Sequence, residues 1–261
     1  MRSVLVFVLL LAGILLTVLY LGQRKMLFPM PAEGLPDQLG SGVELIELPQ
    51  GHALLALPAS AGTPYPLIVF AHGNGEVAHW SLSMADYFRA RGIAVLLLEY
   101  PGYAGSPGRP TALSITQSAL MAVDQVVVRD DIDGDRLIAY GRSIGSGVAT
   151  QLAVHRPTRA LILESPFTSL RALAIAMGMP AFLLRDQFDN AQAMPKLKMP
   201  VFLYHGTQDR LIPISHSERL AELASDVQLL TAECGHNDCP RPWPQVIDFL
   251  VSNGVLGKTD G

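Results

Sequence analysis

The stretch YGRSIGSG (residues 140–147) indicates the fold of the whole chain. It contains the pattern G-x-S-x-G, directly after the apolar run RLIAY (136–140) and ahead of a helix-like segment. In such a pattern the serine occupies a tight strand-to-helix turn, where small neighbours let strand and helix approach closely. The helix N-terminus then offers partial positive charge to an oxyanion. Glycine and serine also fill ordinary turns, so Ser143 is a candidate nucleophile that needs support elsewhere.

That support comes from an acid and a histidine later in the chain. A serine hydroxyl is a weak nucleophile, so it needs a general base, and the base needs an orienting carboxylate. On folds with this nucleophile turn, the chain order is serine, acid, histidine. YHGTQD (204–209) and CGHND (234–238) each follow a strand-like run, and they contain Asp209 and His236. Each residue alone fits an ordinary turn or loop, but their order favours a triad with Ser143.

A glycine-rich turn supplies the fourth part of the predicted site. HGNGE (72–76) follows the first long apolar run, LIVFA (67–71). A turn of this kind presents a backbone N–H to an oxyanion, and the residue after the nucleophile presents the second. We therefore expect Asn74 and Ile144 to form an oxyanion hole. His72 lies too early in the chain for the base, and we expect it to support this loop by hydrogen bonding.

The chain as a whole alternates apolar runs with helical stretches. This alternation predicts an α/β fold with a mostly parallel central sheet and helices on both faces. Two short runs around PQG (49–51) predict a hairpin ahead of it. The remaining strand-like runs are 67–71, 93–98, 136–140, 160–164, 201–205 and 227–231, and the helical stretches include 78–90, 112–128, 215–223 and 242–250.

One segment, residues 165–199, is longer than a simple crossover needs. We expect a small helical lid over the site, and the alternative is an ordinary thick crossover. Its apolar side chains suit an acyl-chain pocket and core packing equally well. They include Phe182, Leu183, Leu184 and Phe188.

The N-terminus departs from the pattern of a globular protein. Val4 to Leu21 is an uncharged apolar run of 18 residues, near the lower end of what spans a bilayer as a helix. No small-residue cleavage site closes it, so we expect an uncleaved transmembrane helix; the alternative is a long cleaved signal. Arg2 on one side and Arg24 with Lys25 on the other lean weakly to a cytoplasmic domain. The short basic start resembles an export signal, which favours the opposite side.

These observations predict three parts in the chain. Residues 1–22 are the anchor or signal, and residues 23–42, rich in proline and glycine, are a linker. Residues 43–256 form the catalytic domain with its lid insertion.

Several motifs together resemble one known group of proteins. HGNGE, EYPGYAGSPG (99–108), GRSIGSG, ESPFTSL (164–170), YHGTQDRLIP (204–213) and CGHND occur in the order found in small membrane-linked α/β-hydrolase-domain serine hydrolases. That group includes bacterial members of unassigned substrate and eukaryotic protein depalmitoylases. The similarity covers about residue 23 onward. Pro101 stands where the group commonly has arginine, and Ala104 where it has glycine.

The resemblance implies the α/β-hydrolase fold and acyl transfer through Ser143, Asp209 and His236. The substrate is then a small-molecule or acylated ester or thioester, and no metal or organic cofactor is required. A serine peptidase of the prolyl-oligopeptidase or aminopeptidase type uses the same triad on the same fold. A catalytically silent, membrane-anchored binding protein is the third reading, against which the intact triad argues. We expect a monomer.

Charge and cysteine content narrow the setting. The net charge of −4, with no basic stripe, argues against a nucleic-acid partner. Asp130 to Asp135 resembles half a calcium loop but lacks the closing glutamate, so a solvated turn is favoured. Cys234 and Cys239 flank His236; a metal there would consume the base. The two cysteines form either a disulfide, which implies an oxidising compartment, or two free thiols. A disulfide and the export-like start favour a periplasmic or extracytoplasmic domain.

Overall fold

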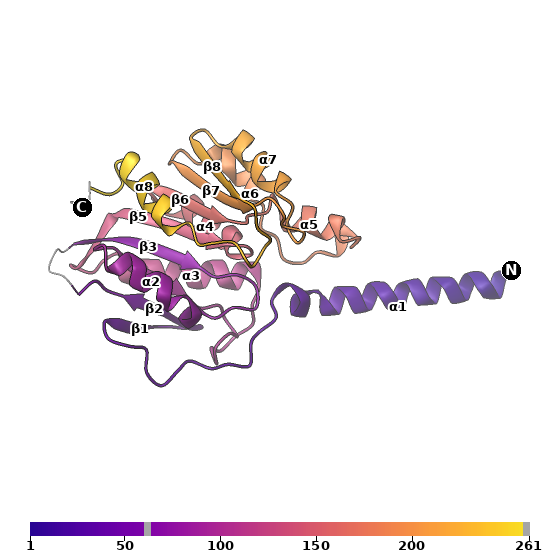
Figure 1. Ribbon diagram of the computed structural model, residues 1–261. Helices are drawn as coiled ribbons and strands as arrows, with labels where there is room; N and C mark the ends of the chain where they lie inside the picture. Colours follow the sequence, from indigo (N-terminus) through magenta and orange to yellow (C-terminus); the bar gives the residue numbers. More distant parts are fainter. Residues whose placement is uncertain (60–63, 258–261) are drawn as a thin grey trace.

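The centre of the protein is an eight-stranded sheet, with β1 at the bottom and β8 at the top of Figure 1. The computed structural model describes residues 1–59 and 64–257 of the chain. The strand order is β1-β2-β4-β3-β5-β6-β7-β8; β1 and β2 form the predicted hairpin, β2 pairs antiparallel with β4, and all later pairs are parallel. The strands are β1 (Val43–Leu48), β2 (Gly51–Ala56), β3 (Tyr65–Ala71), β4 (Ala94–Leu98), β5 (Ile132–Arg142), β6 (Ala160–Glu164), β7 (Val201–Gly206) and β8 (Val227–Ala232).

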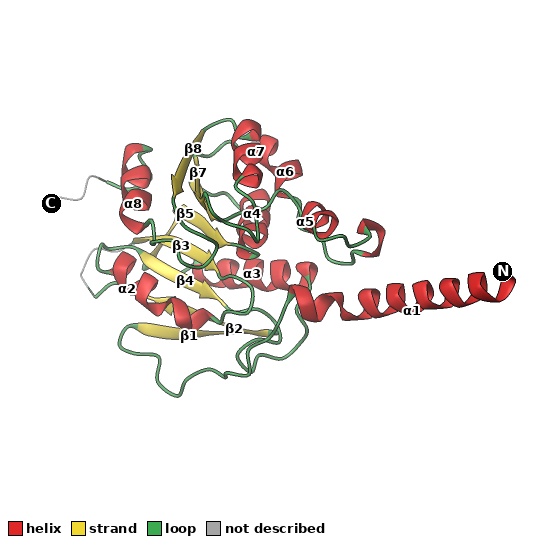
Figure 2. Cartoon of the chain, turned by 45° about the vertical axis from the view of Figure 1, so that its right-hand side comes forward, coloured by secondary structure: helices red, strands yellow, loops and turns green. Residues whose placement is uncertain are grey.

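Helices cover both faces of this sheet (Figure 2), as the alternation of apolar runs predicts. The helices α3, α4 and α7 pack on one face, and α2 and α8 pack on the other. Their bounds are α2 (Leu82–Arg89), α3 (Ala112–Val126), α4 (Gly145–His155), α7 (Ser215–Leu223) and α8 (Trp243–Ser252), with a 3-10 turn η1 at Ala78–Ser81. The predicted fold class is confirmed.

Strand β3 shows why the apolar runs are continuous. Its side chains alternate between the two faces: Leu67 and Val69 join one core, while Ile68 and Phe70 join the other. All of its residues are buried. Because both faces are covered, the strand has no solvated side and therefore no polar alternation.

The lid segment 165–199 contains short helical pieces and lies at the carboxyl ends of the strands. It holds α5 (Leu170–Ala176), η2 (Ala181–Leu183), α6 (Asn190–Ala193) and η3 (Met194–Lys196). In Figures 1 and 2, α5 lies beside the N-terminal helix. Ser169 caps α5 by accepting from the Ala172 N–H at 3.0 Å, which satisfies a donor that the helix leaves free.

The N-terminal helix α1 (Arg2–Leu27) projects away from the domain (Figure 1). It is the one helix among the described residues that is long and apolar enough to cross a membrane, and its apolar stretch is unburied. A signal sequence has the same properties. The helix continues past the predicted boundary at residue 22, because the first helix-breaking residue after it is Pro29. The linker therefore begins after Leu27, five residues later than predicted.

Beneath Ser143, β5 and α4 come so close that glycine is required. A Cβ atom added at Gly141 would collide with the Gly145 carbonyl, and one added at Gly145 would collide with the Ala71 carbonyl. A Cβ at Gly147 would meet the ring of Phe188. The small residues of the motif are thus explained by the distance between strand and helix.

The close approach gives a direct stability test. We expect Gly145→Ala to lower the free energy of unfolding by about 2 kcal/mol, because backbone atoms of β3 must move to admit the methyl group. Gly34→Ala is the matched control, since a methyl group there meets no atom within 4 Å. Denaturant unfolding of both variants measures the difference. Equal stabilities would show that the strand and helix do not meet as described.

Candidate active site

Ser143 lies on a strained turn between β5 and α4. Its φ is +53°, in the left-handed region of the backbone that residues other than glycine rarely adopt. Its N–H donates to the Glu164 carbonyl oxygen at 2.8 Å, which ties the turn to the end of β6. The residue is 6% exposed. The turn therefore directs the hydroxyl into the space above the strand ends.

The three residues predicted to act together are hydrogen-bonded in series. The Nε2 atom of His236 lies 3.0 Å from the Ser143 Oγ, and its Nδ1 atom lies 2.6 Å from the Oδ2 of Asp209. Both distances are within hydrogen-bonding range. A ring that donates from Nδ1 to the carboxylate has a free lone pair on Nε2, which is the atom that faces the serine. The arrangement is therefore suited to proton transfer from serine to histidine.

Asp209 is held in place from both of its oxygens. Its Oδ1 accepts from the Leu211 and Ile212 N–H groups at 2.9 and 2.8 Å, and its Oδ2 lies 3.4 Å from the Nε2 of His205. Burial raises the pKa of this carboxyl, but hydrogen bonds from His205, His236 and the Ile212 N–H outweigh burial. The net pKa is well below the ordinary range, so Asp209 is ionised at neutral pH.

His205 is a site residue that the sequence reasoning missed. It is fully buried at the end of β7, with Nδ1 2.7 Å from the Ser217 Oγ and Nε2 2.7 Å from the Ile212 carbonyl. It thereby braces the loop that carries Asp209. The sequence signal that could have indicated it is its place in YHGTQD, at the carboxyl end of a strand and four residues before Asp209.

The two predicted oxyanion donors lie beside Ser143. Asn74 and Ile144 both line the cavity into which the serine opens. His72 supports the HGNG turn by hydrogen bonding, as expected. It is fully buried, and it contacts the Gly73 carbonyl through Nδ1 at 2.9 Å and Glu99 through Nε2 at 3.2 Å.

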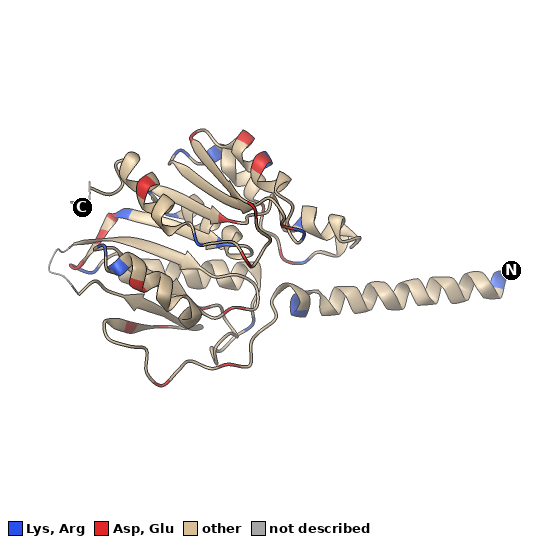
Figure 3. Ribbon diagram, in the orientation of Figure 1, with Lys and Arg blue, Asp and Glu red and all other residues tan. Residues whose placement is uncertain are grey.

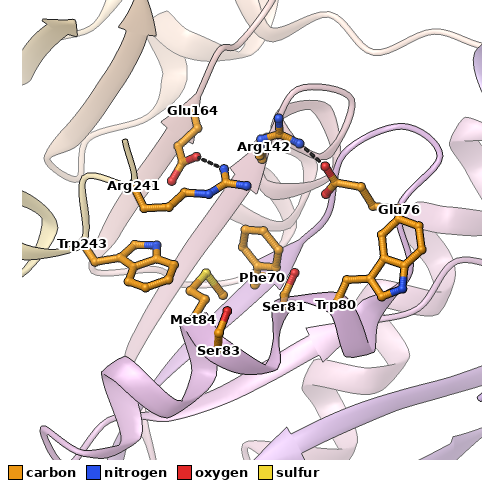
Figure 4. A pocket seen from close by; sticks show the side chains of 10 residues that line it. All are labelled: Phe70, Glu76, Trp80, Ser81, Ser83, Met84, Arg142, Glu164, Arg241 and Trp243. Carbon is orange, nitrogen blue, oxygen red and sulfur yellow. Dashed lines mark hydrogen bonds and ion pairs between the residues drawn. The ribbon is translucent and has the colours of Figure 1, made fainter. Parts of the chain in front are cut away.

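Arg142 is a second residue that the sequence reasoning passed over. Buried next to Ser143, it forms an ion pair with Glu76 (Figure 4). Its Nη2 also donates to the Asn237 Oδ1 at 2.9 Å and to the His236 carbonyl at 3.2 Å. One guanidinium thus joins the glycine-rich turn and the histidine loop to the strand that bears Ser143. Its planar fork of donors suits this bridging role.

A second ion pair lines the same pocket as the first. Arg241 donates to Glu164 at 3.1 Å, and the two side chains face each other beside Trp243 in Figure 4. Tyr140 donates to the other oxygen of the same carboxylate. These contacts fix Glu164, whose backbone carbonyl accepts from Ser143.

A disulfide joins Cys234 and Cys239, with their Cα atoms 5.0 Å apart. It encloses the loop that carries His236, and so decides between the two states that the sequence left open. The close approach of Gly206 to the Cys234 carbonyl leaves no room for a side chain there. The histidine loop is thereby held against the end of β7.

Ser143 opens into an apolar cavity of about 200 Å³. Leu170, Leu173, Ala174 and Leu184 of the lid line it, as does Leu27 of α1. Of the four lid residues singled out by sequence, only Leu184 reaches the cavity. Phe188 packs in the core against Gly147, and Phe182 is 78% exposed.

The loop after Glu99 accommodates Ala104, one of the two departures from the family pattern. Ala104 adopts a φ of +45°, although it is not glycine, and it is buried. Two glycines close by, Gly102 and Gly105, also have positive φ. The loop thus keeps a conformation typical of glycine, at the cost of some strain at Ala104.

Comparison with known proteins identifies the family. Residues 62–185 match a family described as serine aminopeptidase, S33. The chain is 30% identical to the uncharacterized protein MT2364 of Mycobacterium tuberculosis, over 98% of this chain and 96% of that protein. It is 30% identical to human alpha/beta hydrolase domain-containing protein 17B, over 71% of this chain and 65% of that one.

The chain belongs to the α/β-hydrolase superfamily. The fold agrees: the structure of an esterase from Thermogutta terrifontis superimposes with a TM-score of 0.67 at 18% identity, covering 88% of this chain and 99% of that one. As an α/β hydrolase, the protein is a hydrolase, and the resemblance stated from its motifs is confirmed at the level of the superfamily.

The low pKa of Asp209 leads to a prediction about acid stability. Its folded-state pKa lies below the ordinary 3.8, so the ionised carboxylate stabilises the fold above about pH 4. That contribution is lost as the pH falls through the folded-state pKa. We expect Asp209→Asn to lower the melting temperature at pH 7, and the difference from wild type to shrink as the pH falls below 4.

Thermal unfolding between pH 7 and pH 3 measures this difference, with Asp248→Asn at an exposed position as the control. A gap between Asp209→Asn and wild type that stays constant over this range would contradict the assignment.

Proposed function

We propose that the protein is a membrane-anchored serine hydrolase that cleaves carboxylic esters or thioesters through an acyl-enzyme on Ser143. The observation that carries the proposal is the hydrogen-bonded series Ser143–His236–Asp209 at the mouth of an apolar cavity. Serine hydrolases of this kind need a nucleophile, a base and an orienting carboxylate within hydrogen-bonding distance.

The first half of the reaction forms the acyl-enzyme. As the Ser143 Oγ attacks the substrate carbonyl carbon, His236 Nε2 takes its proton, and Asp209 stabilises the resulting imidazolium. The backbone N–H groups of Ile144 and Asn74 donate to the oxyanion. His236 then returns the proton to the leaving alcohol or thiol as the bond to the acyl carbon breaks.

The second half releases the acyl group. Water attacks the Ser143 ester, His236 takes a proton from that water, and the same oxyanion donors stabilise the second tetrahedral species. Collapse of this species returns the proton to the Ser143 Oγ and frees the carboxylic acid. No cofactor takes part in these steps.

The cavity favours an acyl group over a peptide as the ligand. The described residues that line it are uncharged, whereas an aminopeptidase must satisfy the ammonium group of its substrate. The second candidate is nevertheless a serine peptidase, because the matching family is described as a serine aminopeptidase. The third candidate is a catalytically silent binding protein. Such a protein would not require the hydrogen bonds that join Ser143, His236 and Asp209.

The setting we propose is a membrane with the domain on its outer, oxidising side. The helix α1 has the length and hydropathy of a membrane span. Among disulfide-bonded proteins an oxidising compartment is the rule, and the Cys234–Cys239 bond supports the periplasmic or extracytoplasmic side. We further propose that the hydrolase is a monomer with no nucleic-acid partner.

A fluorophosphonate probe tests the enzyme assignment. The purified protein is expected to label, because the activated Ser143 Oγ displaces fluoride from phosphorus. Ser143→Ala should abolish labelling, and His236→Ala should slow it by about 10³-fold or more. Ser252→Ala, at the end of α8, should label like wild type. Labelling that survives Ser143→Ala would exclude this serine as the nucleophile.

A substrate panel then separates the two enzyme classes. We expect turnover of p-nitrophenyl esters and acyl thioesters, and slower turnover of aminoacyl p-nitroanilides by at least about 10²-fold, because the cavity lacks a charged partner for the ammonium group. Steady-state kcat/KM for each series measures the ratio. A preference for the anilides would favour the peptidase.

Thiol alkylation in intact cells tests the compartment. With the disulfide formed on the oxidising side, Cys234 and Cys239 are expected to resist a maleimide reagent until a reductant is added. A gel shift of two maleimide adducts after reduction measures the change. Modification of both cysteines in unreduced, denatured samples would place the domain in the cytoplasm.

A further inference from the structure

We propose that the last turn of α1 forms one wall of the acyl pocket, so that the substrate is an ester or thioester whose long acyl chain is embedded in the same membrane. The proposal rests on the proposed function, and it adds the substrate class and the route to Ser143. It assigns the anchor a role in binding as well as in attachment.

The first observation is which residues line the cavity at Ser143. Met26 and Leu27, at the end of α1, line it together with Ser143 and Ile144. Leu27 is half-buried and packs against the main core, whereas Met26 is 55% exposed. The helix that carries the membrane-spanning run therefore continues into the wall of the site.

The second observation is the short distance between the apolar run and the cavity. Leu21, the last residue of the run, lies six residues before Leu27 in one continuous helix. At 1.5 Å per residue this separation is about 9 Å. The headgroup region of each leaflet is about 5–8 Å deep. The cavity wall thus begins at about the outer edge of the headgroup region, next to the membrane surface.

The third observation is that α1 is fastened to the lid. The buried Gln23 donates to the Leu183 carbonyl at 2.8 Å and accepts from the Arg185 N–H at 2.8 Å. Next to it, Arg24 forms an ion pair with Asp186 at 2.7 Å. Because these contacts are short and one side of each is buried, the helix end keeps its place beside the cavity.

The fourth observation is the position of the cavity mouth. Met26 and Met177 line the cavity, yet Met26 is 55% and Met177 is 68% exposed. They belong to α1 and to the lid respectively, so the opening lies between these two elements. A chain that follows α1 out of the membrane reaches this opening first.

The lid surface around the opening is suited to lipid. Ile175, Met177 and Phe182 are each more than half exposed, on the part of the lid that lies beside α1 in Figures 1 and 2. Between Arg2 and Arg24 the helix carries no charge (Figure 3). Large apolar side chains gathered next to a membrane span are stabilised by contact with the bilayer. The acyl chain thus finds an apolar path from membrane to pocket.

The test uses the full chain in phosphatidylcholine nanodiscs, with p-nitrophenyl palmitate in the bilayer and p-nitrophenyl acetate in the water. We expect Leu27→Trp, which fills the pocket from the α1 side, to lower the palmitate-to-acetate ratio of kcat/KM by about tenfold or more. Leu21→Trp, on the lipid-exposed part of the same helix, is the matched control and should keep the wild-type ratio.

Two further variants keep the test decisive if Leu27→Trp folds poorly. Leu27→Ala removes the same wall without adding volume, and Leu173→Trp fills the pocket from the lid side. Both should lower the palmitate-to-acetate ratio. A wild-type ratio in all three pocket variants would overturn the inference, whereas loss of fluorophosphonate labelling in the wild-type protein would overturn the proposed function itself.

The route is tested by surface dilution. At a fixed bulk concentration of p-nitrophenyl palmitate, added phosphatidylcholine lowers its mole fraction in the membrane. For a substrate that arrives through the bilayer, the rate should fall in proportion to this mole fraction. A rate that depends only on bulk concentration would show delivery through water and contradict the proposed route.

Discussion

The close contact between β5 and α4 is the constraint on which the site depends. The backbones meet at Gly141 and Gly145 with no room for a Cβ atom, and the turn between them forces Ser143 to a positive φ. Such strain persists only where the surroundings overdetermine the conformation. Here the hydrogen bond from the Ser143 N–H to Glu164 and the packing of Phe188 on Gly147 do so. Ser143 is thus positioned by contacts of the backbone.

The sheet, and the grouping of Ser143, Asp209 and His236 at its edge, can be predicted from the sequence because both depend on local patterns. A run such as ALILE (160–164) is apolar up to its last residue, Glu164, because its strand is covered on both faces, and its bounds match β6. Ser143, Asp209 and His236 each follow a strand, and the carboxyl ends of parallel strands meet at one edge of a sheet. The structure accordingly brings these side chains within hydrogen-bonding distance.

What the sequence did not reveal depends on contacts between distant segments. In the sequence, His205 is one strand-end residue among many, and Arg142 is one motif residue among many. Their structural roles come from hydrogen bonds to distant partners, Ile212 and Asn237. The lid shows the same limit, since an apolar residue there can face the cavity, the core or the outside. Leu184, Phe188 and Phe182 take these three positions in turn. The sequence also contains no sign that the end of α1 contacts the lid. The hydrogen bond from Gln23 to Leu183 joins residues far apart in the chain, and helix propensity does not predict such a contact.

The fastening of α1 to the lid has a consequence for how this chain tolerates change in length. Gln23 and Arg24 bind fixed partners in the lid, and Leu27 lies in the cavity wall one turn later. Inserting one residue between Leu21 and Gln23 leaves these contacts intact, but it turns the apolar run of α1 by about 100° relative to the domain and lengthens the helix between them by about 1.5 Å. An insertion between Arg24 and Leu27 instead breaks the register of the pocket. The segment 23–27 is therefore a spacer of fixed length between the apolar run of α1 and the cavity at Ser143.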